Sequence, residues 1–287
     1  MSKHAYLIIA HKNDYVFSTL IKLLDYEHND IYIHMDAKNT SYPVDYIESL
    51  ASKSNIYHCK RISVNWGAYS VVEATISLID KAISTGKYAY YHLISGQDLP
   101  IKSNAYIHEF FNQHKQKEFV HFDSPIFTNY ERVNIYHFTQ EKDGRNPSFI
   151  GKILIKLQKI IKIKRNTNVN FQKGCNWFSI TDNMARHIIE KKEEVKKIFR
   201  YTLIADEIFL QTLLINSSFV NNLYHAQFDN NYISVMRHID WVRGNPYVFR
   251  LTDYNELMNS PCMFARKFDS SIDSDIIDKI AESIYQK

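Results

Sequence analysis

The sequence has 287 residues, 45% of them hydrophobic, which excludes a disordered chain and leaves enough residues for a large core. Its formal net charge of +4 is too small to indicate nucleic-acid binding. The three cysteines, Cys59, Cys175 and Cys262, show no CxxC spacing, which argues against a disulfide framework or a cysteine zinc site and favours a cytoplasmic protein.

The first third of the chain alternates between short apolar runs and segments with helical periodicity. We expect strands at 5–10, 31–35, 56–58 and 88–94, and helices at 15–25, 44–53 and 68–86. This β-α-β-α order predicts an α/β fold with a mostly parallel, Rossmann-like sheet. No GxGxxG or Walker motif occurs, so side chains have to hold any phosphate group. No signal peptide precedes the first strand, and no apolar run approaches the length of a membrane span.

The remaining two thirds of the chain also contain both kinds of segment. We expect helices at 104–115, 150–165, 182–198, 205–215, 253–259 and 272–286, and strands at 118–122, 175–180, 219–225 and 232–235. Ser271 and Asp273 are candidate caps for the last helix. Because no repeat or low-complexity linker divides the chain, the sequence marks no firm domain boundary.

The helix expected at 150–165 combines two faces. Lysines recur at helical spacing, and Ile153, Leu157, Ile160 and Ile161 fill another face. A surface helix that packs its apolar face on the domain is the more common arrangement. The alternative is peripheral membrane contact through residues 152–165, with the helix lying on anionic lipid. A nucleic-acid-binding module would rest on these lysines alone, and it predicts salt-dependent binding to any duplex.

Three further segments contain candidate chemistry. Asp98 follows the strand expected at 88–94, and ligands bind at the carboxyl ends of strands in open α/β sheets; an Asp in a surface turn before Pro100 is an equally good interpretation. Asp206 and Glu207 open a helix, where acids are favoured without any function, or where a Glu acts as a general base.

The third segment, 264–269, brackets Arg266 and Lys267 with two phenylalanines. If the phenylalanines are buried, at least one cation faces a cavity, where a ligand diphosphate would be its counter-ion. The alternative is an ion pair with Asp269. Arg243 lies upstream and is a candidate to join these cations. The thirteen histidines show no HExxH spacing.

Taken in chain order, eight segments resemble the core-2/I-branching β-1,6-N-acetylglucosaminyltransferase family, which includes the peptide O-xylosyltransferases. They span nearly the whole chain and lie at 9–12, 33–38, 66–70, 93–102, 174–178, 205–207, 238–241 and 264–269.

The resemblance implies an α/β, GT-A-like fold: a Rossmann-type mixed sheet flanked by helices. It implies a single glycosyltransferase domain over 1–287, with a nucleotide-binding half at about 1–103 and an acceptor-side half at about 104–287.

The activity that the resemblance implies is inverting transfer of N-acetylglucosamine or a xylose-like sugar from a UDP-sugar to a hydroxyl of a glycan or glycolipid acceptor, without metal or cofactor. The cysteines of the animal enzymes are largely missing, as is their membrane anchor, which fits a bacterial-type member. Such an enzyme would act in surface polysaccharide or lipopolysaccharide synthesis, in the cytoplasm or peripherally at the inner face of the plasma membrane.

The resemblance also implies site residues. Glu207 is the expected general base, Lys267 contacts the donor diphosphate, Asp36 lies at the uridine and Asp98 lies near the donor sugar. The full candidate set consists of donor-binding His11, Asp36, Trp66, Asp98, Arg243, Arg266 and Lys267, and acceptor-binding Glu131, Trp177, Asp206 and Trp241. One departure is that the second diphosphate-binding arginine of the family aligns with Gly244, one residue from Arg243.

Two other functions stay open. One is a metal-dependent transferase on the same fold, in which Asp98 helps to hold the cation. The other is a non-catalytic UDP-sugar or glycan-binding protein, although such a protein has no need of Glu207 as a base.

Overall fold

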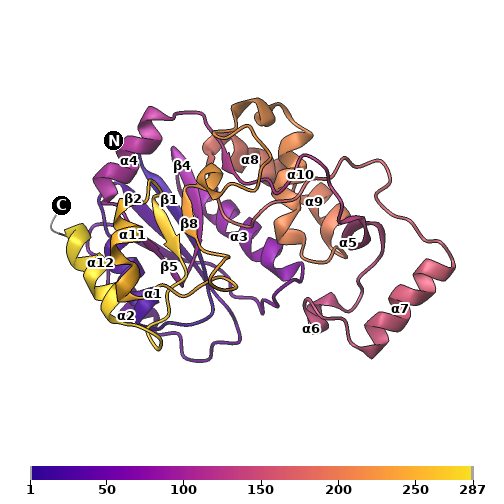
Figure 1. Cartoon of the computed structure of the whole chain (residues 1–287), viewed down its shortest axis with the longest axis horizontal. Coiled ribbons are helices and arrows are strands. Elements are labelled where there is room, and N and C mark those ends of the chain that lie inside the picture. The colour runs from indigo at the N-terminus through magenta and orange to yellow at the C-terminus, as the bar shows by residue number, and fades with distance from the viewer. Residues whose placement is uncertain (1, 286–287) are drawn as a thin grey trace.

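The main sheet of the protein has six strands. A computed structural model describes residues 2–285 and is drawn in Figure 1. The strand order is β3-β2-β1-β4-β7-β6, formed by β1 (His4–Ala10), β2 (Asn29–Met35), β3 (Asn55–His58), β4 (Tyr90–Ser95), β6 (Phe119–Val120) and β7 (Phe178–Thr181). The first four are parallel, whereas β7 runs antiparallel to both β4 and β6. The predicted α/β class, with a mixed and mostly parallel sheet, is confirmed.

A smaller sheet joins the end of the chain to the end of β4. Its order is β5-β9-β8, with β5 (Asp98–Pro100) antiparallel to β9 (Phe264–Arg266) and β8 (Arg237–Ile239) parallel to β9. Only Gly96 and Gln97 separate β4 from β5. The sequence predicted none of these three strands, because three residues are too few to show a period.

Helices cover both faces of the main sheet. On one face, α1 (Tyr15–Leu24), α4 (Asn104–Gln113), α11 (Tyr254–Asn259) and α12 (Asp275–Tyr285) pack against residues such as Tyr6 and Ile8 of β1. On the other face, α3 (Ser70–Thr85), α8 (Asp182–Glu190), α9 (Lys192–Phe199) and α10 (Phe209–Ile215) pack against Ala5 and Leu7. Because both faces of β1 are covered, its sequence after His4 is a nearly continuous apolar run, as in other parallel sheets.

The remaining helices are α2 (Val44–Glu48), α5 (Tyr130–Asn134), α6 (Gln140–Asp143) and α7 (Phe149–Ile160). In Figure 1, α7 lies at one end of the long axis, beyond the sheet and its covering helices. The helix predicted at 150–165 corresponds to α7, which ends at Ile160. Two residues later Lys162 takes a left-handed φ of 56°, which ends the helix.

Several other predictions need correction. The helix expected at 182–198 is two helices, because Lys191 ends α8 and begins α9. The strands expected at 219–225 and 232–235 are wrong: Ser218–Asn222 and Tyr232–Val235 form 3-10 turns. The side chains of Ser217 and Asn231 accept the first amide hydrogens of these turns, and such local bonds compete with strand pairing.

At the C-terminus, the helix predicted at 272–286 is α12. Asp273 accepts a hydrogen bond from the Ile276 amide at 3.1 Å, so Asp273 rather than Ser271 caps it. Residue 286, the last of the predicted helix, lies outside the described residues.

Pairing and packing cross the division expected near residues 103 and 104. Strand β9 of the second half pairs with β5 of the first, β6 and β7 extend the first half's sheet, and α12 packs on α1. The assignment of nucleotide binding to one half and acceptor binding to the other stays a prediction.

Candidate active site

The first group of candidate residues lies where parallel strands end. His11 follows β1, Asp36 follows β2, and Asp98 begins β5 just after β4. The Asp36 amide donates to the Ala10 carbonyl at 2.8 Å, and the Gly96 amide donates to the Ile9 carbonyl at 3.1 Å. With Arg266 and Lys267 at the end of β9, these residues form what we call the strand-end cluster: His11, Asp36, Asp98, Arg266 and Lys267.

Asp98 and Arg266 form a buried ion pair within this cluster. They stand opposite each other in the β5–β9 register, and Arg266 Nη1 lies 2.7 Å from Asp98 Oδ1. The amide and hydroxyl of Ser95 donate to the same carboxylate, each at 2.8 Å. Asp98 is 2% exposed, so its charge needs these partners. The alternative pair with Asp269 is corrected for Arg266, whose partner is Asp98.

The charges of Lys267 and Asp36 both shift the pKa of His11. The pKa of His11 is lowered, first by burial and then by the cation Lys12; Asp36 raises it and Lys267 lowers it further. These effects place both charges within electrostatic range of the imidazole. Lys267 belongs to none of the ion pairs between described residues, although its charge helps to lower the pKa of Asp269. Its ammonium group therefore has room for a closer anionic partner from a ligand.

The second group surrounds Glu207, and we call it the Glu207 cluster: Glu207, Arg132, Lys173, Asp123 and Asp206. Glu207 Oε2 lies 3.0 Å from Arg132 Nη1 and 3.5 Å from Lys173 Nζ. Lys173 also pairs with Asp123. The Glu207 side chain is 32% exposed. The carboxylate is therefore oriented by two cations and still reachable from solvent, which a general base requires.

Asp206 differs from its neighbour. It is 6% exposed, and its Oδ1 has no hydrogen-bond partner among the described residues. Burial, followed by the charge of Glu207, raises the pKa of Asp206 to about 7. The acceptor contact expected for Asp206 stays a prediction, and its burial leaves little side-chain surface for one.

The segment from Gly174 to Trp177 joins the two clusters. The Gly174 amide donates to the Glu207 carbonyl at 2.9 Å, and the Trp177 ring lies 4.7 Å from the Arg266 guanidinium carbon. Three residues span at most roughly 11 Å, so the clusters adjoin. A Cβ on Gly174 would overlap the carbonyl oxygen of His121, so only glycine allows this close approach.

Two other predicted aromatic residues lie on the Glu207 side. Trp241 is 6.2 Å from the ring of Tyr232, which stacks on His121 at 4.3 Å. Trp66 is 63% exposed and faces Arg145, and the carbonyl of the next residue, Gly67, accepts from the Ile204 amide at 2.8 Å. Trp66 therefore lies beside the turn that contains Glu207, and the donor contact that the resemblance implies for it stays a prediction.

The remaining two candidates lie outside both clusters. Arg243 forms ion pairs with Asp240, Asp253 (2.6 Å) and Glu256 (2.9 Å). Glu131 is exposed and pairs with Lys159 of α7 at 2.8 Å. Three carboxylates already neutralise Arg243. It is therefore not a simple replacement for the family's second diphosphate-binding arginine, whose aligned position is Gly244 in this chain.

Sequence reasoning missed four charged residues of this region. Arg132, Asp123 and Lys173 belong to the Glu207 cluster, and the only available signals were that Arg132 follows Glu131 and that Lys173 precedes the segment 174–178. Arg237 is buried and donates to the carbonyl of Phe178 at 3.0 Å. Its pKa is lowered to about 10 by burial, and the charge of Asp98 opposes that shift. No sequence pattern marks a buried arginine.

The described residues contain no cluster of metal ligands, and a large hollow of the protein lies away from both clusters. Within residues 2–285, no group of three or more His, Cys, Asp or Glu side chains could hold a metal ion. A hollow of about 740 Å³ lies between α3 and α9, and neither Glu207 nor Lys267 lines it. Its lining charges, Glu73, Lys192 and Glu193 among them, are of mixed sign, so it offers no focused site for an anionic ligand.

Comparison with known proteins places the chain in a family. The profile described as Branch: Core-2/I-Branching enzyme matches residues 4–264. The chain belongs to this family, whose members are glycosyltransferases.

The individual relatives share low sequence identity with this chain. Xylosyltransferase sqv-6 of Caenorhabditis elegans is 24% identical over 93% of this chain and 34% of its own length. Xylosyltransferase 2 of Homo sapiens is 21% identical over 98% of this chain and 33% of its own length. The chain thus spans about a third of the curated relatives it matches. The crystal structure of mouse Xyloside xylosyltransferase 1, apo form, aligns with 92% of this chain and 97% of its own at 8% identity, with a TM-score of 0.39, too low to carry an argument.

Proposed function

We propose that the chain is an inverting glycosyltransferase that moves a sugar, N-acetylglucosamine or a xylose-like sugar, from a UDP-sugar to a hydroxyl group of a glycan acceptor. The observation that supports this most is the adjacency of two different groups. An accessible carboxylate, Glu207, adjoins the strand-end cluster, which contains the ammonium group of Lys267. Family membership and the xylosyltransferase names of two relatives add support.

Glu207 acts as the general base in this proposal. Its carboxylate takes the proton of the acceptor hydroxyl while that oxygen attacks the anomeric carbon of the donor. The bond between the anomeric carbon and the diphosphate oxygen breaks, and its electron pair leaves with UDP. Arg132 and Lys173 hold the carboxylate in one orientation through the 3.0 Å and 3.5 Å contacts.

Lys267 stabilises the leaving group. Negative charge grows on the diphosphate as the bond breaks, and a fixed cation stabilises the transition state most where charge grows. Arg266 is partly neutralised by Asp98, so it positions the buried carboxylate and contributes less to the diphosphate. We leave Arg243 out of the donor site because of its three carboxylate partners.

The reaction proposed here needs no metal ion. The alternative of a cation held by Asp98 is less favoured, because Arg266 and the Ser95 hydroxyl donate to Oδ1, the Ser95 amide donates to Oδ2, and Arg266 already supplies a positive charge. Activity in excess EDTA is the expected result. Loss of activity that manganese restores would support the metal-dependent alternative.

The pathway and the cellular compartment proposed for this reaction rest on the sequence resemblance alone. We propose synthesis of bacterial surface polysaccharide or lipopolysaccharide, in the cytoplasm. None of the helices among the described residues has the length and apolarity that a membrane span requires.

The test of the proposed function starts from a thermal-shift screen of the full chain against a panel of UDP-sugars, which identifies the donor. With that donor, Glu207→Gln is expected to lower transfer or donor hydrolysis by roughly 10²- to 10⁴-fold and to leave donor affinity nearly unchanged. The matched control is Glu109→Gln on α4, an exposed carboxylate that accepts a bond from Gln113. Full activity of Glu207→Gln would reject the assignment of the base.

The same experiment separates the enzyme from a non-catalytic UDP-sugar-binding protein. Such a protein shows donor-induced thermal shifts in the wild type and in Glu207→Gln, and no sugar transfer or hydrolysis in either. Turnover by the wild type with any donor of the panel excludes it.

A further inference from the structure

Helix α7 exposes a continuous apolar surface. Phe149 is 78% exposed, and Ile160 and Ile161 are 64% and 66% exposed. Ile150, Ile153 and Leu157 are exposed as well. Packing of the predicted apolar face on the domain, the first interpretation of this helix, is therefore wrong. A contiguous exposed apolar patch of this kind marks an interaction surface rather than scattered surface residues.

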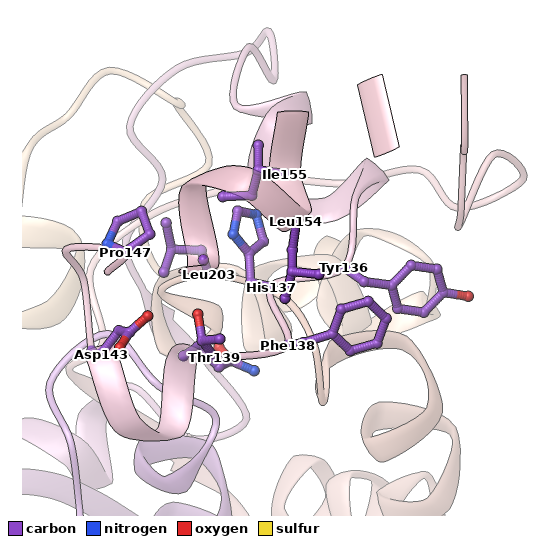
Figure 2. Close-up of a pocket in the computed structure, with 12 residues that line it drawn as sticks. Tyr136, His137, Phe138, Thr139, Asp143, Pro147, Leu154, Ile155 and Leu203 are labelled. Carbon is purple, nitrogen blue, oxygen red and sulfur yellow. The ribbon is translucent and has the colours of Figure 1, made fainter. Parts of the chain in front are cut away.

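A different face of α7 holds the helix on the protein. Leu154 and Ile155 line a small pocket with residues of the segment 136–147 (Figure 2). The side chain of Gln158 accepts from the Tyr136 amide and donates to the Tyr136 carbonyl, both at 2.8 Å. With about 100° between successive residues, Leu154, Ile155 and Gln158 point inward, and the exposed apolar residues occupy a separate arc.

Lysines flank the exposed apolar arc. Lys152, Lys156 and Lys159 lie along one side of it, and all three are exposed. Between Asp143 and Asp182 the sequence contains eight Lys and Arg residues and no Asp or Glu. The surface around α7 is thus apolar and positively charged, with almost no carboxylate to neutralise it.

We propose that α7 docks the protein on the surface of an anionic lipid bilayer. Its apolar arc enters the headgroup region, and the lysines contact lipid phosphates. The 12 residues of α7 span about 18 Å, too short to cross a bilayer, so the helix lies flat. A second copy of this chain is a poorer occupant, because self-association through this face would bring two sets of lysines together.

The docked helix lies close to the Glu207 cluster. Lys159 pairs with Glu131 at 2.8 Å, and the next residue, Arg132, pairs with Glu207 at 3.0 Å. A bilayer under α7 would therefore lie beside the proposed base. Resting on the proposed function, this placement favours an acceptor glycan that is attached to a lipid.

The test is flotation of the full chain with vesicles, using phosphatidylcholine alone or mixed with phosphatidylglycerol. One variant combines Lys152→Glu, Lys156→Glu and Lys162→Glu; Lys159 is kept because it pairs with Glu131. A second variant combines Phe149→Ser, Ile153→Ser and Ile160→Ser. The matched control makes the same charge change on α9, with Lys192→Glu, Lys196→Glu and Lys197→Glu, which are exposed lysines.

The wild type and the α9 control are expected to float with the anionic vesicles, and each α7 variant is expected to bind them at least roughly tenfold less. High salt weakens binding of the wild type. Equal flotation of the α7 and α9 charge variants would overturn the proposal. So would a wild type that ignores anionic vesicles, or one that self-associates through α7 instead.

Two controls keep the result unambiguous. Thermal unfolding shows whether each variant folds as the wild type does. Glu207→Gln is expected to bind vesicles like the wild type, so failure of the proposed chemistry and failure of lipid docking are separate outcomes.

Discussion

Two segments of this chain alternate apolar residues with cations, and they have opposite environments in the fold. In 264–268, both phenylalanines are fully buried, and Arg266 pairs with the buried Asp98. In α7, Phe149 and most of the isoleucines are exposed, and among the described residues its lysines form one ion pair, between Lys159 and the exposed Glu131. Similar composition thus gives a core strand in one place and an exposed surface in the other.

The difference arises from what surrounds each segment. Strand β9 lies between β5 and β8, so its side chains pack on neighbours from both sides. Helix α7 packs on the protein along a narrow face that includes Leu154, Ile155 and Gln158, and Lys159 adds an exposed ion pair. Burial of the first segment stabilises the fold, whereas exposure of the second leaves apolar surface for a partner.

The largest expected effect concerns the apolar residues. Phe268→Ala removes a fully buried ring and should lower the free energy of unfolding by about 4 kcal/mol. Ile160→Ala removes an exposed side chain and should change it by less than about 0.5 kcal/mol. Urea unfolding measures both. Equal losses would show that α7 is packed as tightly as the segment 264–268.

A smaller effect is expected for the two ion pairs. Arg266→Met leaves the buried Asp98 without its cation and should cost about 3 kcal/mol. Lys159→Met breaks an exposed pair with Glu131 and should cost less than about 0.5 kcal/mol. The same urea titrations provide the measurement, and a costly Lys159→Met would contradict the description of α7 as loosely attached.

A third test follows the free energy of unfolding with pH. It rests on the contrast between Asp206, a buried carboxylate beside Glu207, and Glu131, an exposed carboxylate beside α7. Asp206 has a pKa of about 7 in the fold against its ordinary 3.8. Between pH 3.8 and pH 7, Asp206 holds a proton in the folded state that it has lost in the unfolded state. The stability that Asp206 contributes is therefore present below pH 4 and is lost as the pH rises to 7.

Asp206→Asn should remove that dependence. The variant should match the wild type near pH 4 and exceed it at pH 8 by on the order of 2 kcal/mol. Glu118, whose pKa burial also raises to about 7, adds the same trend to both proteins, so the difference between their unfolding free energies is the quantity to compare. A difference that does not vary with pH would place the Asp206 carboxylate in contact with solvent.

Much of the main sheet could be predicted from the sequence. Strands β1, β2 and β4 are buried on both faces, so they are mostly apolar, with His34 and His92 as interruptions, and these runs end at His11, Asp36 and Ser95. The positions of several candidate site residues follow from those ends, because the ends of parallel strands meet at one edge of a sheet.

The partners of those residues could not be predicted. The pairing of Asp98 with Arg266 depends on two three-residue strands that are separated by more than 160 residues. Arg132 reaches Glu207 from α5, a helix of five residues that is too short to show a period, and Lys173 reaches it from a loop. The apolar face of α7 was visible in the sequence, but its exposure depends on which side of the helix finds a neighbour.

The central claim is that the strand-end cluster binds the donor while Glu207 performs the chemistry. Calorimetric titration of UDP into the wild type, Lys267→Ala, Glu207→Gln and the α7 control Lys156→Ala tests it directly. We predict an affinity lowered roughly tenfold or more in Lys267→Ala and unchanged in the other two variants. Binding of UDP by Lys267→Ala at wild-type affinity, or its loss in Glu207→Gln, would contradict the account.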